Sequence, residues 1–127
     1  MTVGLAATTL ANKWLDMLSS TAFTAPTAVW LEEHVGDPGV AGTTSVGAVT
    51  TRQQATFNAA SGGSKTLLNT PTFTQTATET ISHVAAFDAS TVGNFLFSAV
   101  LAVAKSVVAT DTLTFTTLTI SFTPIAA

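Results

Sequence analysis

The chain has 127 residues, of which 9% are charged and 46% are hydrophobic, and its formal net charge is −3. This length fits one domain with one core, and the hydrophobic share excludes a mainly disordered chain. The four basic residues are too few to neutralise a phosphate backbone, so we expect no nucleic-acid partner, and the absence of cysteine excludes disulfides and thiolate metal sites.

An amphipathic helix is predicted at the start of the chain, from about residue 4 to 18. Leu10, Trp14, Met17 and Leu18 have the i, i+4, i+7, i+8 spacing of one helical face, and the Ser19–Thr21 run ends the helix. The segment lacks the basic residues and long apolar stretch of a secretion signal, so we expect synthesis without Sec export. Both chain ends are expected to pack against the domain.

Strands are predicted from about residue 28 onward. Pro26 favours an extended approach to a first strand over Thr27–His34, and Gly36–Asp37–Pro38–Gly39 is a turn sequence. Val40–Thr51 shows no period, which indicates a long connection that follows the surface or a neighbouring molecule. Alternation resumes over Arg52–Ala60, which predicts a second strand.

The middle of the chain alternates between turn sequences and short apolar segments. Ser61–Ser64 is a predicted turn and Lys65–Leu68 a predicted short strand. Pro71 confines the segment around Phe73 to a sheet edge or a loop, because proline cannot donate a ladder hydrogen bond. A longer strand is predicted from Glu79 to Phe87.

A turn at Ala89–Asn94, with Gly93 in the left-handed region, precedes the most apolar segment of the chain. Phe95–Ala104 is apolar on both faces, which is typical of a central strand covered by layers on both sides. The run from Phe95 to Val108 is interrupted by polar residues and is shorter than the ~20 residues of a membrane-spanning helix. We therefore expect no membrane partner.

Threonine alternates with apolar residues from Thr112 to Phe122. The apolar residues are odd-numbered before Thr116–Thr117 and even-numbered after it, so the inward-facing positions shift by one residue there. This shift predicts a bulge or a division into two strands. Together these patterns predict a mainly β protein: a single β-sandwich or jelly-roll-like domain over residues 1–127 with a short N-terminal α-helix.

Polar side chains are densest at the end of the first predicted strand. Alternation places Glu32 and His34 on one face and Glu33 on the other, so with Asp37 nearby only two potential ligands share the strand face, and we expect no metal site. Arg52 is the only arginine, and we expect it to pair with Glu32 or Glu33. His83 is predicted to be a hydrogen-bonded core or interface residue.

Nothing in the sequence indicates catalysis or a cofactor. It has no nucleophile elbow, no carboxylate pair and no phosphate-binding loop, so we expect neither catalytic nor cofactor-binding residues. A lectin or carbohydrate-active enzyme would need exposed aromatic platforms, and Trp30 is the one candidate, with an interface anchor as the alternative.

The order of segments resembles that of a family of small virion proteins of tailed bacteriophages, which are labelled tail fibre or capsid structural proteins. The segments that carry the resemblance are Leu10–Asp16, Thr21–Pro26, His34–Gly39, Arg52–Gly63, Ile81–Ala89 and Gly93–Ser98. The resemblance implies a β-sandwich-type virion component without catalytic residues.

Low charge and hydroxyl-rich strand faces suit extensive protein contact. We therefore expect a virion protein that decorates the outer head surface as a homo-oligomer such as a trimer, in contact with the major capsid protein. The alternative is a tail or tail-fibre component that contacts tail proteins and a host receptor. The candidate interface residues are Trp14, Trp30, Val40, Thr43, Thr44 and Val46.

Overall fold

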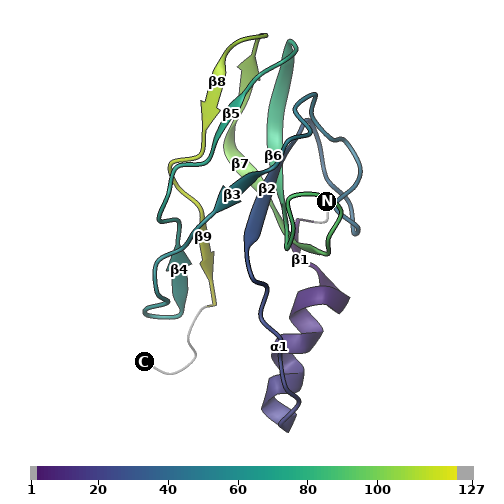
Figure 1. The fold of residues 1–127 in the computed structure, drawn as a ribbon, viewed down its shortest axis with the longest axis vertical. Coiled ribbons are helices and arrows are strands. Elements are labelled where there is room, and N and C mark those ends of the chain that lie inside the picture. Colours follow the sequence, from purple (N-terminus) through teal and green to yellow (C-terminus); the bar gives the residue numbers. More distant parts are fainter. Residues whose placement is uncertain (1–2, 123–127) are drawn as a thin grey trace.

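Antiparallel strands are the main regular structure of the computed structural model, which describes residues 3–122 (Figure 1). The expected packing of the chain ends at residues 1–2 and 123–127 lies outside the described residues. A helical segment comprises a π-helical turn Ala7–Ala11, α1 Asn12–Asp16 and a 3₁₀ turn Met17–Ser19. The strands are β1 Gly4–Leu5, β2 Val29–His34, β3 Gln53–Ala55, β4 Ser64–Thr66, β5 Thr72–Thr74, β6 Glu79–Phe87, β7 Phe95–Val107, β8 Thr112–Thr114 and β9 Thr119–Ser121.

Residues 3–122 form one five-stranded sheet and two two-stranded ribbons. The sheet has the order β1-β7-β6-β2-β3, and the ribbons are β4–β9 and β5–β8. All pairs are antiparallel. In Figure 1 the β5–β8 ribbon lies above the β4–β9 ribbon, and the helical segment projects from the lower end of the molecule.

The main core lies between the sheet and the ribbons. Leu31 and Ala86 from the sheet belong to the same buried cluster as Phe73 and Phe115 from the β5–β8 side. Phe73 is fully buried and meets Phe115 edge to face, with ring centroids 5.7 Å apart. Apolar side chains from two facing β layers therefore build the core, and the prediction of a mainly β, sandwich-type fold with a short N-terminal helix is confirmed.

The predicted helix begins later than expected. Gly4 and Leu5 pair with Ser98 and Phe97 of β7 and form a strand instead of the first helical turn. Gly4 has a φ of 141°, which a glycine adopts easily and a helix does not use. From Ala7 to Ser19 the chain is helical, and it ends in the predicted serine-rich run, where Ser20 is left-handed with a φ of 63°.

The outer half of β7 is exposed, so the prediction of a strand covered on both faces is wrong beyond Ser98. Val100 and Val103 are 51% and 66% exposed. In the described chain β7 has β6 along one side, but only the two-residue β1 along the other. Its register with β6 also shifts: Ile81 pairs with Lys105 and His83 with Val100, so four residues of β7 stand opposite Ser82 alone. The bulge lifts this part of β7 away from a regular ladder.

Other predictions hold with shorter boundaries. The strand expected over Arg52–Ala60 is regular only from Gln53 to Ala55, because Phe57 makes an isolated bridge to Leu67 instead. The Thr112–Phe122 segment divides into β8 and β9 at the predicted point. The predicted turn after β6 also forms, with Gly93 at a φ of 74°.

Candidate functional site

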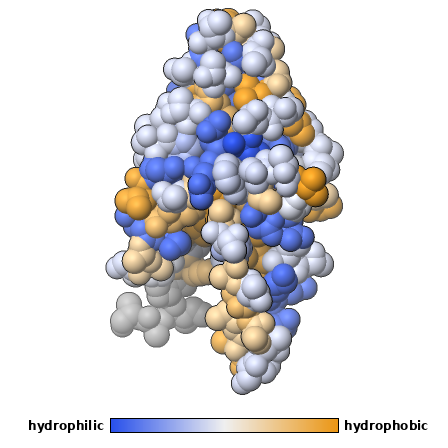
Figure 2. All heavy atoms as spheres, in the orientation of Figure 1, coloured by the Kyte–Doolittle hydropathy of each residue, from blue (hydrophilic) through white to orange (hydrophobic). Residues whose placement is uncertain are grey.

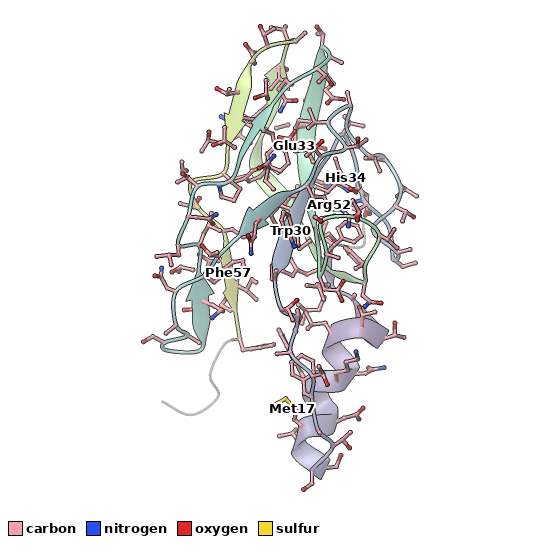
Figure 3. The ribbon with its side chains drawn as sticks, in the orientation of Figure 1. Met17, Trp30, Glu33, His34, Arg52 and Phe57 are labelled. Carbon is pink, nitrogen blue, oxygen red and sulfur yellow. The ribbon has the colours of Figure 1, made fainter. Side chains whose placement is uncertain are left out.

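A partly buried polar cluster lies on the outer face of the sheet, the face opposite the ribbons. Leu31 and Glu33 of β2 face the ribbons, and strand alternation therefore turns Glu32 and His34 to the other face. Figure 3 labels Glu33, His34 and Arg52. The Arg52 Nε donates to Glu32 Oε2 at 2.9 Å, and His34 Nε2 lies 3.3 Å from Glu32 Oε1. The predicted pairing of Arg52 with Glu32 is therefore confirmed.

Arg52 joins this cluster to the turn after β6. Its Nη1 donates to the carbonyl oxygens of Ala89 and Val92 at 3.0 and 2.6 Å, and its guanidinium carbon lies 3.4 Å from the centre of the Phe87 ring. Burial alone would raise the pKa of Glu32, but hydrogen bonds from His34 and Arg52 and the positive charge of Arg52 hold it below its ordinary value. The cluster is thus a charged clamp that positions loops.

The loop of residues 40–51 is held on the same face. His34 Nδ1 bonds to the carbonyl oxygen of Thr44 at 2.8 Å, and the Val35 amide donates to the Ser45 carbonyl at 2.8 Å. At Gly42 a side chain would meet Phe95, since a Cβ there would lie 2.4 Å from its ring. The long connection predicted to follow the surface is therefore fixed to the sheet at several points.

The six predicted interface residues fall in different parts of the structure. Val40, Thr43, Thr44 and Val46 are exposed on the 40–51 loop, with Val40 at 84% and Val46 at 38% exposure. Trp30, labelled in Figure 3, is half-buried on β2. It pairs with Phe87 of β6, so both side chains lie on the same face of the sheet.

Trp14, by contrast, lies on the projecting helical segment (Figure 1), half-buried and edge to face with Phe122 at 5.2 Å between ring centroids. The structure thus groups the four loop residues on one side of the molecule and leaves Trp14 on a separate element. Their role in contacts stays a prediction.

A buried carboxyl lies between the layers, a feature not predicted from the sequence. Glu33 is fully buried, and the Nε2 of buried Gln75 donates to its Oε2 at 2.8 Å. Among residues 3–122, Glu33 Oε1 and Gln75 Oε1 lack a hydrogen-bond partner. Burial raises the pKa of Glu33 to about 7; the Gln75 hydrogen bond opposes this and the Glu79 charge adds to it. Leu31 and Glu33 are two positions apart on the strand and therefore point to the same face. This spacing is the sequence feature from which the burial of Glu33 could have been predicted.

A second missed feature is an apolar groove between the helical segment and the β4–β9 ribbon. A cavity of about 420 Å³ opens there, and a second hollow of about 780 Å³ adjoins it, with Trp14, Phe23 and Phe122 common to both. The first is lined mainly by apolar residues, among them Leu10, Val29, Phe57 and Ile120. Such a surface can bind apolar side chains.

Residues 3–122 contain neither a candidate metal site nor a candidate membrane-spanning helix. This part of the chain holds no group of three or more His, Cys, Asp or Glu side chains placed to bind a metal ion. Nor does it contain a helix of sufficient length and hydrophobicity to cross a membrane.

The fold and its surfaces define a small antiparallel β protein whose prominent exposed features are a clamped loop and an apolar groove. The family model described as Gp80, podophage GP4 fiber I protein gp80, matches residues 5–123, and the chain belongs to this family. The prediction of a bacteriophage structural protein family of the tail fibre type is thereby confirmed. No curated protein matches the chain.

Proposed function

We propose that the protein is a non-enzymatic component of a phage tail fibre, assembled as a homo-oligomer, with a trimer as the expected state. The observation that carries the proposal is the family match, which covers residues 5–123 and describes a fibre protein. A protein in a fibre acts through the surfaces that contact its neighbours, so a small chain without a catalytic site is sufficient for this role.

The clamped loop supports a role in rigid recognition. Arg52 and His34 hold the 40–51 loop and the turn after β6 against one sheet face, so the exposed side chains of Val40, Thr43 and Thr44 need little ordering when a partner binds. Preorganisation of this kind lowers the entropic cost of association. We propose this loop as the contact with a neighbouring tail protein or a host receptor.

The absence of catalysis is part of the same proposal. Glu32, His34 and Arg52 are engaged with one another and with loop carbonyls, and Glu33 is buried between the layers. None of these four side chains combines solvent access with a partner that would activate it as a nucleophile or base.

Decoration of the outer head surface, with the major capsid protein as partner, is the second candidate. The observation in its favour is the low charge of the chain, 9% of residues, together with exposed threonine faces on β5 and β8. Such a surface suits contact repeated over many symmetric copies.

The deciding experiment is quantitative mass spectrometry of purified heads and purified tails, with copy number expressed relative to the major capsid protein. A small copy number that copurifies with tails is the expected result. Hundreds of copies in the head fraction would replace the fibre proposal with decoration.

A further inference from the structure

Five large apolar side chains are exposed together around the helical segment. This helix patch consists of Leu5, Leu15, Met17, Leu18 and Phe122, whose exposed fractions are 36%, 64%, 53%, 87% and 57%. The hollow of about 780 Å³ beside Trp14 is lined by all five. In Figure 2 the helical segment is largely orange on the side that faces the β4–β9 ribbon, and Figure 3 places Met17 on that side.

The helix patch is large for a free monomer. With about 200 Å² for a fully exposed large apolar side chain, the five exposed fractions amount to roughly 600 Å². Monomeric proteins rarely expose a contiguous apolar patch above a few hundred Å², and a larger patch marks an interaction site.

The helical segment is also weakly supported by its own chain. Within residues 7–19 the buried side chain is that of Leu10, and all of α1 is at least partly exposed. A helix of this length is marginal in water unless one face is buried against a partner. The segment therefore gains most of its stability when something covers Leu15 and Leu18.

We propose that a second copy of this chain covers the helix patch, with the apolar helix face of one copy packed into the groove of the next. This inference deepens the proposed homo-oligomer by naming its interface. Two copies that each bury roughly 600 Å² reach the ~1,200 Å² at which specific interfaces become stable. The patch is self-complementary in chemistry, because the same copy offers both the projecting leucines and the groove they fill.

The first test is the mass of the purified full chain over a concentration series by light scattering or sedimentation. We expect a dimer or trimer of the 12.9 kDa chain at micromolar concentration. Leu15→Asp should weaken association at least about a hundredfold, because it places a charge in the apolar contact. Leu68→Asp is the matched control, since Leu68 is 63% exposed and lies outside the patch. A chain that stays monomeric, or equal effects of both substitutions, would overturn the proposal.

A second test does not depend on how Leu15→Asp folds. The chain has no cysteine, so Leu18→Cys and Leu68→Cys each introduce a single thiol. We expect labelling of Cys at position 18 by a polar maleimide to slow at concentrations where the chain associates, and labelling at position 68 to stay constant. A labelling rate at position 18 that does not change with protein concentration would refute the interface. Both tests use isolated protein, so their outcomes do not depend on whether the protein is found in phage heads or in phage tails.

Discussion

Replacing Glu33 by glutamine tests the buried carboxyl between the two β layers. Glu33 is fully buried and accepts a hydrogen bond from Gln75, while one oxygen of each side chain lacks a partner among residues 3–122. A protonated carboxyl is neutral, so it avoids the cost of a buried charge. Glutamine has nearly the same shape and stays neutral at every pH.

The expected magnitude follows from the pKa of Glu33, which burial raises from 4.5 to about 7 in the folded protein. Between these values the folded state binds more protons than the unfolded state, so the free energy of unfolding falls as pH rises. The stabilisation is complete below about pH 4.5 and lost above about pH 7. It corresponds to about 3 kcal/mol, since each pKa unit is worth about 1.4 kcal/mol.

Urea denaturation at pH 5 and pH 9 provides the assay. We expect Glu33→Gln to exceed the parent chain in stability at pH 9 by up to about 3 kcal/mol, and the difference to shrink to near zero at pH 5. Asp16→Asn is the control, because it also removes one carboxyl, but one that is exposed at the helix end and not buried between the layers. A pH-independent difference between Glu33→Gln and the parent chain would refute the reasoning.

Three further substitutions test the loop and the core. Gly42→Ala should cost at least about 2 kcal/mol more than Gly62→Ala in denaturation experiments: both glycines have positive φ, but a Cβ at Gly42 lies 2.4 Å from the Phe95 ring and one at Gly62 meets nothing within 4 Å. Equal costs would mean that the loop does not pack on the sheet. Arg52→Ala should lower stability by about 3 kcal/mol and speed hydrogen exchange in residues 88–94, with Arg52→Lys restoring only part; full restoration by lysine would deny the carbonyl contacts any role. Phe73→Ala should cost about 3–5 kcal/mol, and a loss below about 1 kcal/mol would show that the β5–β8 ribbon does not close the core.

The alternation of apolar and polar residues was sufficient to predict the strands whose two faces differ. β2 and β6 follow their predicted ranges closely, and the phase change at Thr116–Thr117 marks the division between β8 and β9. The Arg52 pairing was also predictable, because a lone arginine near two strand carboxylates has few other partners.

The features that sequence alone did not predict depend on contacts between distant segments. Gly4 pairs with Ser98, 94 positions away, and no local pattern marks a two-residue strand of this kind. Val103 lies among the residues of β7 that bulge opposite Ser82, whereas Val100 still pairs with His83 and is exposed all the same; the uniform apolar run reveals neither fact. Helical spacing predicts an apolar face that includes Leu18, but whether the same copy covers that face is decided by tertiary structure.

The bulge in β7 has a consequence for how copies can meet. An unbroken open strand is a template on which another chain can add hydrogen-bonded strands without limit. Here four residues opposite Ser82 interrupt that template, and the far edge of the sheet, β3, is three residues long. Edge-to-edge strand pairing between neighbouring copies is therefore disfavoured. Copies then associate through side-chain contacts, which allow an assembly of finite, symmetric size.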